Sequence, residues 1–239
     1  MACWSFVRPM DFFVTRVAET GSTNDDLAAA AREGAPHGSV LVTGHQTTGK
    51  GRLGRVWTAP PGSNLLVSVL FRNEVGDGFG IGDPHRLVQR VSVSMALAVE
   101  SVTGVRPVLK WPNDLLVGDA KLAGVLAQSS ASDGRIDWVV VGIGTNVGWA
   151  PEGAAGLPTT TPDELLDAWL VHLAATTDVA AAYRERLDTL GRAVRVETLT
   201  ETFDAVATDV LDDGRLVVTT PDGDRVVGMG DVTHLRHAP

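Results

Sequence analysis

Short runs rich in valine and leucine, separated by tight-turn dipeptides, recur along this chain and restrict the folds it can adopt. Four such runs lie between residues 108 and 143, separated by Asn113-Asp114, Gly118-Asp119 and Asp133-Gly134. Strands joined by turns this short pair as antiparallel neighbours, because a parallel crossover needs a dozen or more residues. The sequence therefore predicts a mostly antiparallel meander.

Three segments with helical character accompany these strands. Ser22-Thr23-Asn24 caps a predicted helix that reaches Arg32, and apolar residues at helical spacing predict a second helix over residues 84–102. The stretch from 161 to 190 begins with a capping threonine and a proline. It predicts two helices, or one helix broken near Thr177.

The chain divides into two expected domains. Residues 1–190 carry the helices and, with further valine-rich runs over 39–43 and 64–71, predict a mixed, mostly antiparallel sheet backed by helices. Residues 191–239 contain short valine-rich segments joined by Asp-Gly turns and predict a small all-β domain. The fold class is therefore α+β, in a chain whose 239 residues suffice for a buried core.

The composition argues against several classes of protein. A formal net charge of -9 has the wrong sign for general binding of nucleic acid or of an acidic membrane. The single cysteine, Cys3, rules out an internal disulfide and a multi-cysteine metal site, and its place near the amino terminus makes it a poor catalytic thiol. No apolar run reaches membrane-spanning length. We therefore expect a cytoplasmic protein with neither a nucleic-acid nor a membrane partner.

A glycine-rich loop from Gly44 to Trp57 carries several cations. Its first residues almost spell a phosphate-binding P-loop, but Gly51 stands where that motif needs a magnesium-binding Ser or Thr. What remains is a flexible backbone with Lys50, Arg52 and Arg55 between glycines, which suits an anionic ligand. From the loop alone, a solvated basic hairpin is an equally good interpretation.

Lysine is rare in this chain: three of its 20 basic residues are lysine, namely Lys50, Lys110 and Lys121. The last two flank a predicted hairpin that also holds Asn113-Asp114, so its arms bring cations, an amide and a carboxylate together. Alone, Asn113-Asp114 would be interpreted as a turn. Further on, Gly142-Ile143-Gly144 lacks the spacing of a dinucleotide site, and a glycine pair that lets a buried strand pack closely on a ligand explains it better.

Four motifs, in this order, resemble those of the bacterial biotin protein ligase family. They are Ser22-Thr23-Asn24, Gly49 to Arg55 with Trp57, Lys110 to Asp114 with Lys121 to Leu126, and Gly142 to Val147. The resemblance covers about the first two thirds of the chain. It implies a class II synthetase-like catalytic domain followed by a small SH3-like β barrel. It also implies a short form without a DNA-binding domain, for which the residues before Ser22 are too few.

In that family, residues near the first helix and a glutamine before the glycine-rich loop line the biotin pocket, and the loop covers the carboxylate. A buried ureido ring needs matched donors and acceptors, and the valeryl chain needs an apolar slot. The resemblance therefore implies a biotin-binding set of Ser22, Thr23, Asn24, Gln46, Lys50, Gly51, Arg52, Lys121, Gly124, Gly142 and Gly144.

The same resemblance assigns the ATP site and the chemistry. It implies an ATP-binding set of Arg52, Arg55, Trp57, Lys110, Asn113, Lys121 and Asn146. It makes Arg52, Lys121 and Asp114 the catalytic residues, with Asp114 receiving the target lysine, because an amine attacks only as the free base. Lys50 departs from the family, where arginine is usual. This difference keeps the charge and loses the bidentate fork.

The implied reaction has two steps. Biotin carboxylate displaces pyrophosphate from magnesium ATP to give biotinyl-5'-AMP, and a lysine of the biotin carboxyl carrier domain of an acyl-CoA carboxylase then displaces AMP. Magnesium (Mg2+) would be held mainly by the ATP phosphates, and no metal ligand is assigned. A lipoate protein ligase is the nearest alternative, and a biotin-sensing transcriptional repressor is an alternative of another class. An octanoyl transferase would need a catalytic cysteine.

Overall fold

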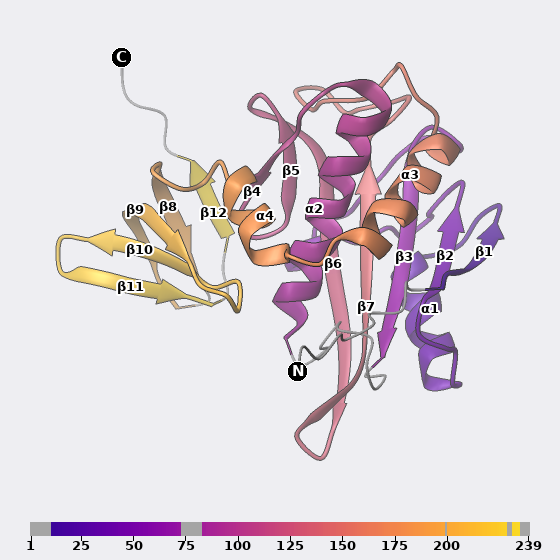
Figure 1. The fold of residues 1–239 in the computed structure, drawn as a ribbon, viewed down its shortest axis with the longest axis horizontal. Helices are drawn as coiled ribbons and strands as arrows, with labels where there is room; N and C mark the ends of the chain where they lie inside the picture. The colour runs from indigo at the N-terminus through magenta and orange to yellow at the C-terminus, as the bar shows by residue number, and fades with distance from the viewer. Residues whose placement is uncertain (1–10, 73–82, 199, 229–230, 235–239) are drawn as a thin grey trace, which may run out of the picture.

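The computed structural model describes residues 11–72, 83–198, 200–228 and 231–234, and its strands form two separate sheets (Figure 1). The larger sheet has seven strands in the order β1-β2-β3-β7-β6-β5-β4. Their bounds are β1 (Phe13–Val17), β2 (Ser39–Thr43), β3 (Leu65–Arg72), β4 (Val108–Lys110), β5 (Asp114–Val117), β6 (Ala120–Ser132) and β7 (Arg135–Thr145). Neighbouring strands are antiparallel except β1 and β2, so the predicted mixed, mostly antiparallel sheet is confirmed.

Helices cover both faces of this sheet. The long helix α2 (Pro84–Thr103) and α3 (Pro162–Ala175) pack on one face, and α1 (Thr23–Arg32) packs on the other (Figure 1). After a break over 176–178, α4 (Val179–Arg186) follows α3. Two separate helices, one of the two predicted arrangements, are therefore present.

The predicted extension of helical structure to Leu190 is wrong, because the chain turns to pair with β4 instead. Leu187 forms an isolated parallel bridge with Leu109. The hydroxyl of buried Thr189 then accepts a hydrogen bond from the backbone N–H of Trp111 at 2.9 Å. The segment after α4 is thus tied to the segment that follows β4.

Alternate residues of the central strand β7 face two different hydrophobic clusters. The odd-numbered residues from Val139 to Ile143 pack with α2 and α3 in the larger cluster. Trp138 and Val140 face the other way and pack with α1. Because side chains alternate along a strand, Gly142 and Gly144 must lie on the α1 face. On that face, the strand therefore presents side chains near its start and bare backbone near its end.

The predicted small C-terminal β domain is confirmed as a five-stranded antiparallel sheet in the order β11-β10-β9-β8-β12. Its strands are β8 (Ala193–Glu197), β9 (Thr202–Val210), β10 (Leu216–Thr220), β11 (Gly223–Val227) and β12 (Asp231–His234). The buried Trp111 joins the domains by donating a hydrogen bond from Nε1 to the carbonyl of Gly214 at 2.9 Å. Neither β12 nor β1 was predicted, and the division at residue 190 stays a prediction.

The composition led to two further expectations, one about Cys3 and one about membrane-spanning segments. Cys3 lies outside the described residues. None of the described helices is both long enough and apolar enough to cross a membrane.

Candidate active site

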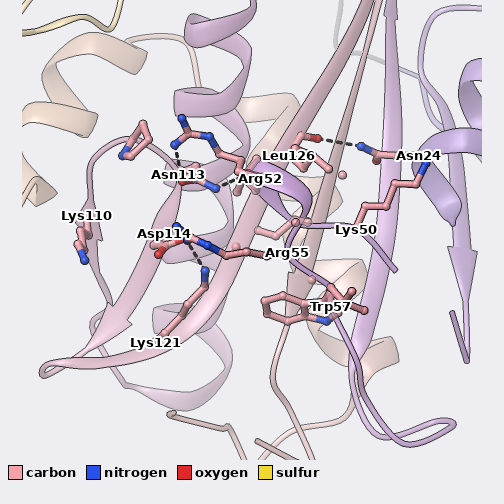
Figure 2. A pocket seen from close by; sticks show the side chains of 18 of the residues that line it. Asn24, Lys50, Arg52, Arg55, Trp57, Lys110, Asn113, Asp114, Lys121 and Leu126 are labelled. Carbon is pink, nitrogen blue, oxygen red and sulfur yellow. Dashed lines mark hydrogen bonds and ion pairs between the residues drawn. The ribbon is translucent and has the colours of Figure 1, made fainter. Parts of the chain in front are cut away.

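One cavity collects the predicted site residues on the α1 face of the large sheet. It encloses about 250 Å³ and is bounded by α1, the glycine-rich loop, strands β3 to β7 and the edge of the C-terminal sheet. Figure 2 shows side chains that line it. Every residue predicted to bind biotin or to act in catalysis lines it, and so does every predicted ATP-binding residue except Asn146. The fold thus brings four separate motifs to one place.

At one end of the cavity, which we call the neutral end, the lining residues Ser22, Thr23, Asn24 and Gln46 are uncharged. Hydrogen bonds join Thr23 to Gln46, and Ser68, next to the lining, joins Thr23 and Asn24. Gln46 Oε1 accepts hydrogen bonds from the backbone N–H and from Oγ1 of Thr23, at 2.8 and 3.0 Å. Ser68 Oγ lies 2.8 Å from Thr23 Oγ1 and 2.6 Å from Asn24 Oδ1. Because a serine hydroxyl has one proton, it donates to one of them at a time, which leaves acceptor capacity for a ligand.

Glycines form the floor of the cavity on β6 and β7. A Cβ on Gly142 would overlap Asn24 Oδ1, and a Cβ on Gly144 would lie 2.6 Å from Cε2 of Trp57. Gly124, the partner of Gly144 on the neighbouring strand, also lies against the Trp57 ring. At Gly142 and Gly144 an added Cβ does not fit without a shift of Asn24 or Trp57, and at Gly124 it would be tight, so backbone itself lines the cavity.

The glycine-rich loop closes into a tight hairpin. At its base, the backbone N–H of Trp57 donates to the carbonyl of Gly49 at 2.9 Å, and an isolated antiparallel bridge joins Lys50 to Val56. A 3-10 turn over Arg52–Gly54 forms the tip. The loop is therefore a basic hairpin that also lines the cavity, and its binding of an anionic ligand stays a prediction.

The opposite end, which we call the charged end, consists of Arg52, Arg55, Lys110, Asn113, Asp114 and Lys121. Lys121 Nζ lies 2.7 Å from Asp114 Oδ1, with side-chain exposures of 40% and 22%. Arg52 donates from Nη1 to Asn113 Oδ1 at 3.2 Å, and Arg55 extends toward Asp114, whereas Lys110 lies apart from the others (Figure 2). All three predicted catalytic residues thus lie at this end.

Two aromatic side chains, Trp57 and Tyr183, lie near the charged end. Lys121 Nζ lies 5.9 Å from the centroid of the Trp57 ring, whose face attracts a cation weakly. Behind Asp114, burial and then the Asp114 charge raise the pKa of the Tyr183 phenol well above its ordinary value. Tyr183 therefore remains uncharged at physiological pH.

Asn146 lies behind the cavity. It is buried, its side-chain amide donates to the carbonyl of Ala155 at 3.0 Å, and its Oδ1 accepts from Asn64 at 3.3 Å. These bonds attach the end of β7 to neighbouring segments. A contact between Asn146 and ATP stays a prediction.

Sequence reasoning missed several residues that line the site or support it. Ser68 is a lone hydroxyl in a valine-rich strand, and its position opposite Gly142 in the sheet could have indicated it. Glu197, Val232 and Thr233 reach the cavity from the C-terminal sheet. No motif in that sheet singled them out, yet they make the C-terminal domain part of the site.

Family models match both domains. Residues 18–146 match the biotin/lipoate A/B protein ligase family, which is more than half of the chain. Residues 189–235 match the biotin protein ligase C-terminal domain and include the five-stranded sheet.

Curated relatives span most of the chain. A biotin--[acetyl-CoA-carboxylase] ligase of Mycobacterium tuberculosis is 37% identical over 92% of this chain and 88% of its own length. A ligase of the same name from Paracoccus denitrificans is 28% identical over 90% of this chain and 98% of its own length. A bifunctional ligase/repressor BirA of Bacillus subtilis is 29% identical, but the match covers only 47% of that protein.

A solved structure has the same fold. The biotin protein ligase of Aquifex aeolicus, in complex with biotin and ATP, aligns with a TM-score of 0.76 at 24% identity, covering 93% of this chain and 98% of that one. The family models and the relative at 37% identity add sequence similarity to this likeness in fold. The chain belongs to the biotin protein ligase family.

Proposed function

We propose that this chain is a biotin protein ligase, which activates biotin with ATP as biotinyl-5'-AMP and transfers it to a lysine of a biotin carboxyl carrier domain. The observation that carries the proposal is the division of one cavity into a neutral end and a charged end. A matching substrate has an uncharged polar head group and, a short chain away, an anion to be activated. Biotin has both.

The neutral end suits the ureido ring of biotin. Thr23, Asn24 and Ser68 are buried and offer uncharged donors and acceptors. Their mutual hydrogen bonds leave spare acceptor capacity, and a ligand that covered it without offering donors would forfeit about 1–3 kcal/mol for each group left unsatisfied. The dithiolane ring of lipoate has no hydrogen-bonding groups to match them. This end therefore favours biotin over the nearest alternative substrate.

The glycine floor suits the part of biotin between its two polar ends. Backbone at Gly124, Gly142 and Gly144 gives a flat surface, and the Trp57 ring lies over part of it. A thiophane ring and a valeryl chain can lie flat against such a surface and bury apolar area.

The cations of the charged end serve the adenylation step. A biotin carboxylate oxygen attacks the α-phosphorus of ATP, and pyrophosphate leaves. Lys121, Arg52 and Arg55 offset the repulsion between the two anions and the charge that develops at phosphorus. In the part of the chain that the structure describes, no three His, Cys, Asp or Glu side chains are grouped as a metal site would need. We propose that Mg2+ enters with ATP and is held mainly by its phosphates.

Asp114 serves the transfer step. The carrier lysine arrives as an ammonium and must lose a proton before its nitrogen attacks the acyl carbon and releases AMP. In the structure, Asp114 is paired with Lys121. Once a phosphate or carboxylate binds Lys121, the Asp114 carboxylate is free to orient the ammonium and to accept its proton.

The names of two relatives support the acceptor. Both the Mycobacterium tuberculosis and the Paracoccus denitrificans proteins are named biotin--[acetyl-CoA-carboxylase] ligases. We therefore propose the carrier domain of an acyl-CoA carboxylase as the partner of this chain. Its cytoplasmic location stays a prediction from the composition.

Exchange of labelled pyrophosphate into ATP tests the proposal, with biotin and lipoate supplied as alternative acids. We expect exchange with biotin and none above background with lipoate. Exchange with lipoate alone would overturn the assignment.

A further inference from the structure

Lys50 points away from the charged end. Its Nζ lies 2.5 Å from Oδ2 of Asp25 in the first turn of α1, with side-chain exposures of 48% and 41%. In Figure 2 its side chain runs toward the helix that carries Asn24, on the opposite side of the cavity from Asp114 and Lys121. The lysine that departs from the family pattern is therefore engaged with a helix at the neutral end.

Asp25 is held in place from two directions. Gln128 on β6 donates from Nε2 to Asp25 Oδ1 at 3.1 Å, while Lys50 contacts the other carboxylate oxygen. The hydrogen bond from Lys50 is the main cause that lowers the pKa of Asp25 below its ordinary value. The carboxylate is therefore charged at neutral pH and connects the sheet, α1 and the glycine-rich loop.

Lys50 lies at the base of the glycine-rich loop, so its ion pair restrains more than one side chain. The residue is bridged to Val56 in the other arm, and the adjacent pair Gly49 and Trp57 is hydrogen-bonded across the same base. Movement of the loop away from the sheet would have to separate Lys50 from Asp25. Restraining the base also restrains Trp57, which lies over the glycine floor.

We propose that Lys50 and Asp25 form a clasp that holds the glycine-rich loop closed over the neutral end and slows the release of the bound acyl-adenylate. Lys50 is then a positioning residue, and neutralising the biotin carboxylate falls to Lys121 and Arg52. This inference rests on the proposed function for the identity of the bound ligand. The alternative is that Lys50 leaves Asp25 and contacts the carboxylate directly.

Proteolysis of the unliganded protein tests the clasp without any substrate. An arginine-specific protease cuts after Arg52 and Arg55, in and beside the tip of the loop, and its sites are unchanged by substitution of Lys50. We expect Asp25→Asn to speed cleavage there by about two- to fivefold, the range for loss of a half-exposed ion pair.

Asp26→Asn is the matched control for that experiment. Asp26 is the next acid in the same helical turn, and its carboxylate contacts Thr20 and not Lys50. Its substitution therefore removes the same charge near the helix start without touching the clasp. We expect the control to leave the cleavage rate unchanged. Equal acceleration by both variants would show that helix electrostatics, and not the clasp, protects the loop, and would overturn the proposal.

A double-mutant cycle then separates the clasp from direct contact with the carboxylate. The enzyme is loaded with biotin and ATP, and release of biotinyl-5'-AMP is followed in Asp25→Asn, Lys50→Gln and the double variant. If the two residues act through each other, each single change speeds release about two- to fivefold and the double variant is no faster. Additive effects would mean that Lys50 acts on the ligand independently, and would overturn the clasp.

The two proposals fail in different ways. If wild-type protein shows no biotin-dependent pyrophosphate exchange, the proposed function fails, whatever the protease result. If exchange is normal but Asp25→Asn leaves both cleavage and release unchanged, the clasp alone is wrong.

Discussion

The neutral end and the charged end of the cavity are built in opposite ways. Thr23, Asn24 and Ser68 are at most 4% exposed, carry no charge and already hydrogen-bond one another. Lys121 and Asp114 are 40% and 22% exposed and satisfy each other as ions. The groups of the neutral end therefore hold one another before a ligand binds and keep spare acceptor capacity, whereas under the proposed function the charged end exchanges its internal partners for substrate. The proposed function thus gives recognition to buried, mutually hydrogen-bonded groups and chemistry to more exposed groups that can change partner.

Replacing Lys121 by alanine separates the two ends most sharply. The variant loses a cation that stabilises charge at the α-phosphorus, so we expect biotin-dependent pyrophosphate exchange to fall about 10²- to 10³-fold. Affinity for biotin alone, measured by calorimetry, should fall far less because the neutral end is intact. Lys110→Ala is the control, since Lys110 lies apart from the Lys121 and Asp114 pair (Figure 2). A comparable loss from the control would show that the cations act only as a diffuse field.

Asp114→Asn divides the charged end itself into two tasks. We expect transfer from preformed biotinyl-5'-AMP to the carrier to slow about 10²-fold, as for loss of a general base, while pyrophosphate exchange falls less than about tenfold. Single-turnover transfer and exchange measure the two steps separately. Equal losses in both would contradict this division of roles.

Gly142→Ala tests the neutral end by adding a methyl group to the glycine floor beneath it. The new methyl group would overlap Asn24 Oδ1 and crowd Ser68, which displaces the hydrogen-bond network. We expect biotin affinity to fall about 10- to 100-fold, in line with the cost of overpacking. Affinity for ATP should change little. A thermal melt checks that the variant is folded, and an equal loss of ATP affinity would contradict the separation of the two ends.

Ser68→Ala makes a smaller change in the same place. It removes the hydroxyl that lies between Thr23 and Asn24 without adding bulk. The loss of one hydrogen-bonding group predicts a rise in KM for biotin of about two- to tenfold, with KM for ATP unchanged. Full retention of biotin affinity would mean that the network is not needed to hold its members in place.

The smallest predicted effect is on thermal stability and concerns His234, a residue of the C-terminal sheet that lies near the charged end. His234 Nε2 lies 3.1 Å from the hydroxyl of Thr189, the acceptor for the Trp111 N–H. Burial, with the nearby charges of Lys110 and Arg192, lowers the pKa of His234 below its ordinary value of 6.5. The folded protein therefore favours the neutral ring. Its contribution to stability is complete above pH 6.5 and declines as the pH falls below that value, because the unfolded chain binds the proton first.

Melting curves between pH 7 and pH 5.5 measure this contribution. We expect the fall in Tm over that range to be about one or two degrees greater in the wild type than in His234→Gln. An equal fall in Tm in both proteins would show that protonation of His234 does not contribute to the pH dependence of stability.

The sequence predicted most of the fold where local signals and packing agree. The glycine-bounded strands and the threonine-capped helix α3 are examples, because neighbouring residues in the sequence determine their turns and caps. Strand β1 was missed because all five of its residues are exposed, so it shows no alternation, and its partner β2 lies more than twenty residues on. Strand β12 was missed because β8, its partner, lies at the other end of the small sheet's sequence. Both depend on pairing between distant segments.

The candidate site was predictable where its residues form motifs and not where single side chains complete it. Ser68 and Glu197 lie in strands whose other residues follow ordinary patterns. Only the assembled sheets show that Glu197 lines the cavity and that Ser68 hydrogen-bonds to two residues that line it. The direction in which the Lys50 side chain points could not be predicted from the sequence either. The family pattern suggests a partner at the carboxylate, whereas Asp25, an ordinary acid at a helix start, holds the side chain in the structure.

The alternation along β7 makes the cavity a reporter of correct strand pairing. If β7 paired one residue out of register, Val141 and Ile143 would project into the cavity, while Gly142 and Gly144 would face the larger core. Such a molecule would contain as much sheet as the native one, but its cavity would be filled. Counting biotin-binding sites in freshly refolded protein would therefore measure the fraction of molecules with correct register, which measurements of strand content cannot distinguish.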